Sequence, residues 1–159
     1  MNLEAQLAHL VAEAPKYGVP SIIMEKGVIP VISAFAQQLG HTEYYLRQTT
    51  DNNLVLTILA NEKHPELEKK VIYAFPTAED ATQFPDNKTS KLEIVPQAFP
   101  VSQILFQMFT MKEVDSIIFI DNPQQYQQSK EIYCHKLQAA IRQSLTNLVN
   151  AVTNNSRIV

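Results

Sequence analysis

The N-terminal third of the chain carries apolar residues at helical spacing. One such stretch covers residues 2–15, and Gly18 and Pro20 behind it are typical stop signals. In the next stretch, residues 28–39, apolar residues recur at i, i+3, i+4, i+7 and i+11, and Gly40 follows. The pattern therefore predicts two N-terminal helices.

Runs of β-branched and aromatic residues then predict five strands, at residues 43–49, 54–60, 71–75, 92–95 and 115–120. The first two runs flank Asp51-Asn52-Asn53, which predicts a turn and a β-hairpin. The run 54–60 is nearly continuous in apolar residues and is expected inside the sheet. The more polar run 43–49 suits an edge.

Helical and strand patterns alternate between Lys70 and Pro123. Thr77 can cap a short helix behind the run 71–75, and a helical apolar pattern follows Pro100. This alternation is typical of βαβ units. A long helix is predicted from about Ser129 to Val152, with one apolar stripe made of Tyr133, Leu137, Ile141, Leu145, Leu148 and Val152.

These elements predict an α/β fold with α+β character. We expect a single domain over residues 1–153, followed by a flexible tail at residues 154–159. About five strands form a mixed sheet, two N-terminal helices precede it, and the long C-terminal helix packs across it.

Composition narrows the classes of function. The 159 residues are 45% hydrophobic and 18% charged, as in ordinary globular domains. A formal net charge of −3 gives no basic surface, so we expect no nucleic-acid partner. Only three glycines occur, and they are not clustered, which excludes a dinucleotide fingerprint or a P-loop. We expect no cofactor.

The sequence also bears on the compartment. No apolar run approaches the roughly 18 residues that a membrane span needs, so no membrane insertion is expected. A single cysteine excludes an internal disulfide and suits a reducing compartment. The start of the chain lacks the basic segment and apolar block of a secretory signal. We expect a cytoplasmic protein.

Residues 70–123 resemble the SseB family, small bacterial proteins named for enhanced serine sensitivity. The similarity lies in Val71-Ile72-Tyr73-Ala74-Phe75-Pro76-Thr77-Ala78-Glu79-Asp80-Ala81 and in Ile117-Ile118-Phe119-Ile120-Asp121-Asn122-Pro123. It implies a strand, an acidic first helical turn and a later strand that ends in Asn-Pro, and it implies no catalytic residues. Gln124 stands where SseB-like sequences often have glycine. The segment Ala14-Pro15-Lys16-Tyr17-Gly18-Val19-Pro20 and the composition are similar to those of a cyanobacterial protein family.

Four polar residues are candidates for ligand binding, because ligands of parallel sheets bind outside the carboxyl ends of the strands. They are Thr77, Gln97, Asp121 and Asn122. Thr77 would begin a helix whose N-terminus could hold an anion. Asp121 and Asn122 could orient hydroxyl or amine groups, and in an enzyme Asp121 could be a general base. The competing interpretation is structural, with Thr77 as a cap and Asp121-Asn122-Pro123 as a turn.

Two pairs of titratable residues do not make a catalytic or metal site. Cys134 and His135 are neighbours on a predicted helix and diverge by about 100°, so they cannot face each other. Cys134 is expected to be a small buried residue. His41 and Glu43 share a predicted strand face but lack a third ligand. We expect no catalytic residue and no metal.

Four apolar residues are candidates for a partner surface. Phe106 and Met111 flank the core-facing side of the helix after Pro100, while Ile132 and Tyr133 widen the stripe of the C-terminal helix. The leading hypothesis is therefore a non-catalytic interaction or regulatory protein that binds a protein partner or forms a homodimer. The alternative is a small-ligand-binding protein or enzyme that uses the strand-end loops.

Overall fold

The structure, a computed structural model, describes residues 1–85 and 93–157, with side chains up to residue 153. Its strands are β1 (Glu43–Gln48), β2 (Thr57–Leu59), β3 (Lys69–Phe75), β4 (Val95–Pro100), β5 (Ser116–Phe119) and β6 (Lys130–Tyr133). Its α-helices are α1 (Leu3–Glu13), α2 (Ser21–Ile23), α3 (Ile29–Ala36), α4 (Ala78–Gln83), α5 (Val101–Met108) and α6 (Cys134–Arg157). The segments η1 (Ala14–Tyr17) and η3 (Tyr126–Gln128) are 3-10 helices, and η2 (Met24–Val28) is a π-helix.

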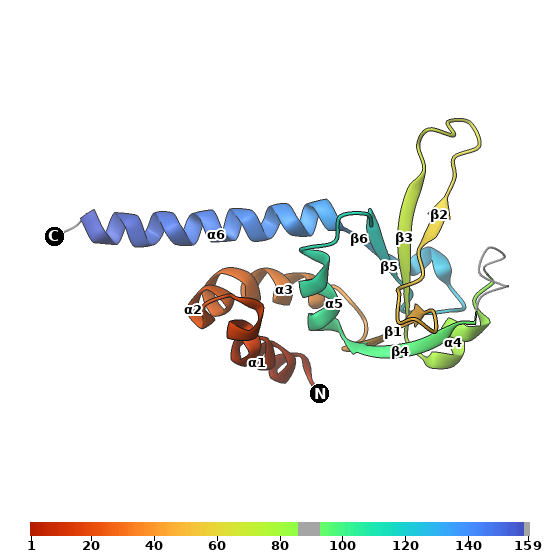
Figure 1. Cartoon of the computed structure of the whole chain (residues 1–159), viewed down its shortest axis with the longest axis horizontal. Coiled ribbons are helices and arrows are strands. Elements are labelled where there is room, and N and C mark those ends of the chain that lie inside the picture. The colour runs from red at the N-terminus through yellow and green to blue at the C-terminus, as the bar shows by residue number, and fades with distance from the viewer. Residues whose placement is uncertain (86–92, 158–159) are drawn as a thin grey trace.

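The strands form one mixed sheet with the order β4-β1-β3-β5-β6, and β2 pairs with β3 beside this path. β3 and β5 are parallel, and every other pair is antiparallel. Because β1 is antiparallel to both of its neighbours, β4 points in the same direction as β3 and β5. The predicted α/β architecture, with a mixed sheet, N-terminal helices and a long C-terminal helix, is confirmed (Figure 1).

The predicted hairpin forms only next to its turn. A turn does form, with the Thr49 amide donating to the Asn53 carbonyl at 2.9 Å and Asn52 in the left-handed region at φ 64. Gln48 and Leu54 form an isolated antiparallel bridge, and the Val55 amide donates to the Arg47 carbonyl at 2.9 Å. Farther along, β2 pairs with β3 instead of β1. β1 lies inside the sheet rather than at its edge, because its alternate residues Tyr44 and Leu46 are buried in the core. β2, which was expected inside the sheet, has one described strand partner, β3, and lies at an edge.

Two predicted boundaries were also wrong. The fourth strand occupies Val95–Pro100 rather than 92–95, and residue 92 lies outside the described residues. It contains two prolines, which an edge strand tolerates because its outer amides need no partner. The long helix begins at Cys134, since Lys130–Tyr133 pairs with β5 as β6. α6 is helical to Arg157, within the segment expected to be a tail.

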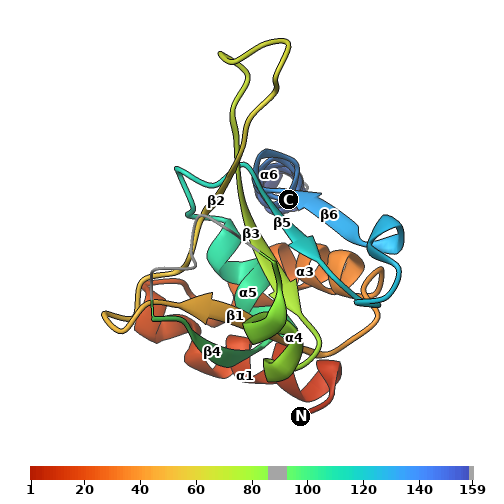
Figure 2. The same ribbon diagram turned by 90° about the vertical axis from the view of Figure 1, so that its right-hand side faces the viewer.

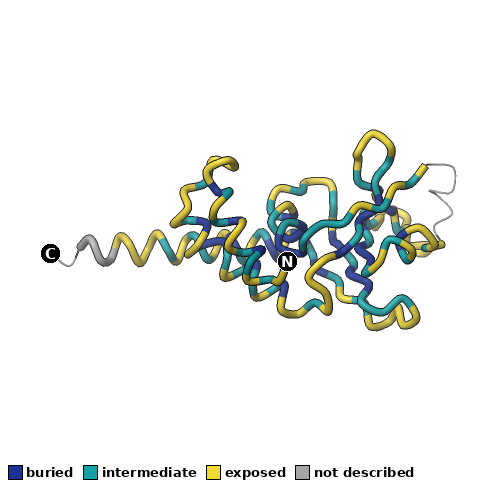
Figure 3. The backbone as a smooth tube through the Cα atoms, turned by 90° about the horizontal axis from the view of Figure 1, so that it is seen from below, coloured by how far each residue is buried: buried dark blue, intermediate teal, exposed yellow. Residues whose placement is uncertain are grey.

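The helices divide unequally between the two faces of the sheet. α1, α3, α5 and α6 lie on one side, and α4 alone lies on the other (Figures 1 and 2). The main core fills the first interface, and the buried residues gather there (Figure 3). The second face has a small core of Phe75, Ala81 and Ile120 with partly buried aromatic residues around it. Among the described residues, α4 is the α-helix on that face, and most of the face has no helical cover.

A close contact with the π-helix η2 fixes the course of α6. The Ser144 hydroxyl donates to the Gly27 carbonyl at 2.6 Å, and a Cβ on Gly27 would lie 2.6 Å from Leu145 Cδ2. Leu137 and Ile141 are fully buried at the start of the helix. The C-terminal part of the helix continues past the elements that cover its start (Figure 1), and Val149 and Val152 there are exposed. No helix in the described part of the chain has the length and apolarity that crossing a membrane requires.

We predict that Ser144→Ala lowers the free energy of unfolding by about 1 kcal/mol, because the Gly27 carbonyl loses its donor at a packed contact. Urea denaturation followed by circular dichroism measures this. Gln143→Ala is the matched control, since Gln143 is exposed and bonds only the exposed Asn147. Equal stability of the two variants would contradict the role given to this contact.

Candidate functional site

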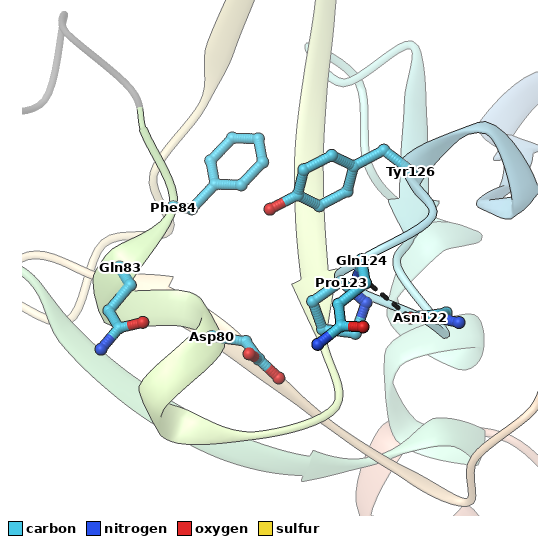
Figure 4. Close-up of a pocket in the computed structure, with 7 residues that line it drawn as sticks. All are labelled: Asp80, Gln83, Phe84, Asn122, Pro123, Gln124 and Tyr126. Atoms are coloured by element: carbon cyan, nitrogen blue, oxygen red, sulfur yellow. Dashed lines mark hydrogen bonds between the residues drawn. The ribbon is translucent and has the colours of Figure 1, made fainter.

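Two adjoining pockets form a cleft beside the carboxyl ends of β3 and β5 (Figure 4). α4, which follows β3, makes one wall, and residues 122–126, which follow β5, make the other. Phe84 and Tyr126 line both pockets, and each pocket has a volume of about 400 Å³. This size suits a small ligand. We call the two pockets together the strand-end cleft.

One half of the strand-end cleft is polar. It is lined by Asp80, Gln83, Phe84, Asn122, Pro123, Gln124 and Tyr126. The side chains of Asp80 and Gln124 point toward each other across the cleft, whereas Gln83 points away (Figure 4). Asn122 Oδ1 accepts from the Gln124 amide at 3.0 Å and so fixes the second wall. Asp80 is the one charged side chain among the lining residues that the structure describes.

The other half is apolar and lies against the sheet. Its lining residues are Tyr73, Phe84, Pro85, Ile118, Ile120, Tyr126 and Ser129. The ring of Phe84 lies between those of Tyr73 and Tyr126, with centroid distances of 4.6 Å and 5.8 Å. Tyr126 is 48% exposed, so this wall is open to solvent on one side. Such a surface can take an apolar body.

A buried arginine supports these rings without lining either pocket. Arg47 is 3% exposed, and its guanidinium lies 5.3 Å from the ring centroid of Phe84 and 5.9 Å from that of Tyr73. It also donates to Thr57 Oγ1 at 3.4 Å. The guanidinium of Arg47 therefore already makes the cation–π contacts that these rings could otherwise offer to a ligand cation.

Thr77 caps α4 instead of lining the cleft. Its hydroxyl accepts from the Asp80 amide at 3.1 Å and donates to Asp80 Oδ2 at 2.6 Å. α4 has only six residues, and Glu79 and Asp80 occupy its first turn. Two carboxylates at this helix start repel an anion, so the surroundings of Thr77 do not favour the expected anion site.

Asp121 is engaged in a network that joins distant parts of the chain. One carboxylate oxygen accepts a short hydrogen bond from the Tyr44 hydroxyl, and the other accepts from the Gly40 amide at 3.1 Å. His41 Nε2 lies 3.2 Å from the Asp121 carbonyl oxygen. Burial, together with the hydrogen bond to Asp121, raises the pKa of Tyr44 far above its usual value. Asp121 thus holds the segment before β1 against the end of β5.

The structure brings one of the four predicted ligand residues, Asn122, to the cleft. Gln97 lies within β4, opposite Leu46, because the strand extends to Pro100. Sequence reasoning missed Asp80, Phe84 and Tyr126. Phe84 follows the last residue of α4 and Tyr126 lies in a 3-10 helix, so no helical pattern in the sequence joins them to Asp80.

The predicted partner residues have separate surroundings. Phe106 is half-buried and stacks edge-on with Tyr17, with ring centroids 5.1 Å apart, and the half-buried Met111 packs against the core. Ile132 is 5% exposed, so it offers a partner almost no surface. Tyr133 is half-buried on β6, with the ammonium of Lys69 5.4 Å from its ring centroid. The expectation that Ile132 and Tyr133 widen a helical stripe was wrong, because both lie on a strand.

A polar cluster lies on the same face of the sheet as α4, farther from that helix. Lys69 Nζ donates to Glu131 Oε2 at 2.7 Å, and the buried Ser116 hydroxyl donates to the same oxygen. Burial works to raise the pKa of Glu131, but hydrogen bonds from Lys69 and Ser116 hold it below its usual value. These groups satisfy one another. Within residues 1–85 and 93–157, no group of three or more His, Cys, Asp or Glu could hold a metal ion.

The second half of α6 presents a different surface. Residues 143–153, which we call the distal α6 segment, contain no charged side chain. Leu145 and Leu148 are half-buried, whereas Val149 and Val152 are 58% and 59% exposed. The apolar stripe of α6 therefore continues past the elements that bury its first half (Figure 3).

Comparison of the chain with protein-family models, with curated proteins and with solved structures finds no match. The resemblance of residues 70–123 to the SseB family stays a prediction.

We predict that Tyr44→Phe lowers the free energy of unfolding by about 1.5–3 kcal/mol, because it removes a buried hydrogen bond to a charged group. Thermal and urea unfolding both measure this. Tyr126→Phe removes the same atom from a ring that is 48% exposed and is expected to change stability by less than about 0.5 kcal/mol. If Tyr44→Phe is as stable as this control, the hydrogen bond between Tyr44 and Asp121 does not stabilise the fold.

Proposed function

We propose that the protein is a non-catalytic interaction protein that works as a homodimer, formed through the distal α6 segment. One observation carries this proposal: an uncharged, apolar-striped half-helix extends beyond the body of the molecule (Figure 1). A second copy of the same segment is its partner. The compartment that we infer is the cytoplasm, where the buried thiol of Cys134 stays reduced.

The first argument is the continuity of the stripe. Leu137 and Ile141 are fully buried by the helices beneath α6, Leu145 and Leu148 are half-buried, and Val152 is 59% exposed. The same row of side chains therefore passes from core to solvent along one helix. A half-helix without tertiary packing is only marginally stable in water, so a partner that covers the stripe would stabilise it.

The second argument concerns charge. An exposed helix face normally carries Glu, Lys or Arg, whereas the polar residues of the distal α6 segment are Gln, Ser, Thr and Asn. Depletion of charge is the compositional mark of an interface core. It also permits identical segments to pair, because no like charges meet between them. This favours a second copy over a partner chosen by opposite charge.

The third argument fixes the orientation. The body of the molecule lies at the N-terminal end of α6 (Figure 1). Antiparallel pairing of two distal segments places the two bodies at opposite ends, where they do not collide. It also opposes the two helix dipoles, which is favourable. The two-fold axis would then pass beyond Leu148, because Leu145 and Leu148 already pack beside Gly27.

Several titratable groups have structural partners, which supports a non-catalytic role. Asp121 binds Tyr44, and Glu131 binds Lys69 and Ser116. Burial, with a smaller contribution from Asp115, raises the pKa of Cys134 to about 11, so its thiol is protonated and a poor nucleophile at neutral pH.

We predict that Val152→Asp raises the dimer dissociation constant at least tenfold, because each dimer would bury two unpaired carboxylates. Light scattering coupled to size exclusion measures the mass across a dilution series, starting from twice the 18.0 kDa of the monomer. Val152 is exposed in the monomer, so its replacement leaves the fold intact.

Asn150→Asp is the matched control. Asn150 is exposed, and two residues on a helix place it about 200° around from Val152, on the opposite side. This variant adds the same charge at the same end of the helix and is expected to dimerise like the parent chain. A parent chain that stays monomeric at the highest soluble concentration would refute the proposal.

A further inference from the structure

We propose that the strand-end cleft binds a small molecule with an apolar, ring-sized body and a protonated amine. This site is separate from the distal α6 segment. Asp80 would take the amine, and the apolar half between Phe84 and Ile118 would take the body. The inference stands on the lining residues and not on the proposed dimer.

The body of the ligand is defined by the apolar half. Tyr73 and Ile118 form its floor on the sheet, and Phe84 and Tyr126 form its sides. Ring contacts from Phe84 to both tyrosines hold these side chains in place, and the buried Arg47 supports Phe84 from below the cleft. A preformed apolar wall of this kind binds by excluding water from a flat hydrocarbon surface.

The rings alone do not make a cation site. A positive ligand held by aromatic faces needs their negative quadrupole, and the guanidinium of Arg47 already lies 5.3 Å from the Phe84 centroid and 5.9 Å from the Tyr73 centroid. A ligand cation would have to compete with this guanidinium for the same ring faces. The amine must therefore bind outside the apolar half.

Asp80 provides that position. It lies on α4, which ends at Gln83, and it lines the polar half of the cleft together with Phe84, the residue directly after the helix. Thr77 engages Oδ2 of Asp80, which leaves Oδ1 open to a ligand in the described part of the chain. Gln124 points toward Asp80 from the opposite wall and can accept a second proton of the amine through its carbonyl oxygen (Figure 4).

The same lining residues select against anions. The described residues that line the two pockets include no Lys, Arg or His, and their one charge is the carboxylate of Asp80. A ligand carboxylate at this position would be repelled and left without a donor of opposite charge. The predicted order of affinity for one apolar body is thus amine, then alcohol, then carboxylate.

Three probes with the same phenyl body test this order: 2-phenylethylamine, 2-phenylethanol and 3-phenylpropionate. Titrations of the full-length protein, followed by amide chemical shifts in NMR, give their dissociation constants at pH 7. We expect the amine to bind at least tenfold more tightly than the alcohol, with shifts centred on residues 80–84 and 122–126, and the carboxylate to bind most weakly. Equal affinity for the three probes, or no saturable binding of the amine, would overturn the proposal.

Two variants distinguish the effect of the Asp80 charge on binding from an effect on folding. Asp80→Asn keeps an oxygen for the Thr77 hydroxyl and is expected to bring the affinity for the amine down to that for the alcohol. Glu79→Gln removes an equal charge from the adjacent residue, which does not line the cleft, and is expected to preserve the tenfold preference. Melting curves confirm that both are folded. A preference that survives in Asp80→Asn would assign the amine to another group and refute the site.

Discussion

The structure depends on one constraint: the sheet is covered by helices on one face almost exclusively. α1, α3, α5 and α6 bury that face in a single core, while α4 alone covers a small part of the other. The buried side chains of β1, Tyr44 and Leu46, belong to the covered face, and Arg47 supports aromatic rings on the opposite face. Both surfaces to which we assign binding roles follow from this asymmetry.

On the helical side, the layer beneath α6 is shorter than α6 itself. Gly27 permits close approach and Ser144 bonds its carbonyl, so α6 is held against η2 as far as Leu145 and Leu148. The end of the distal α6 segment then extends beyond the body, and the apolar residues Val149 and Val152 are exposed there. On the other side, the partial cover given by α4 leaves an aromatic wall beside one carboxylate. The two surfaces are formed by different side chains, and we assign them different binding partners.

The sequence was sufficient for the class of fold because the long apolar patterns were clear, as in the helices at both ends and in the strands around Val71 and Ile117. It was misleading at β1, whose polar residues suggested an edge although Tyr44 and Leu46 alternate toward the core. It was also misleading at Ile132 and Tyr133, because four residues fit a strand or a helical stripe equally well.

The candidate site was predicted only in its position. The carboxyl ends of the central strands were the right region, and Asn122 lies there. Thr77 acts as the helix cap that the competing interpretation gave it. Asp121 binds Tyr44, a partner distant along the chain that a single sequence does not show. Tyr126 lies in the glutamine-rich segment 124–128, which has no clear helix or strand pattern in the sequence. Its role depends on the fold that carries it beside Phe84.

The central claim is that a second copy orders the distal α6 segment. Amide hydrogen exchange at several protein concentrations tests it most directly, because local opening of an unpaired half-helix is fast and pairing slows it. The account predicts that amides of residues 146–153 exchange rapidly in dilute protein and slowly in concentrated protein, while those near Leu137 and Ile141 are protected throughout. Exchange of the distal segment that does not vary with concentration would contradict it.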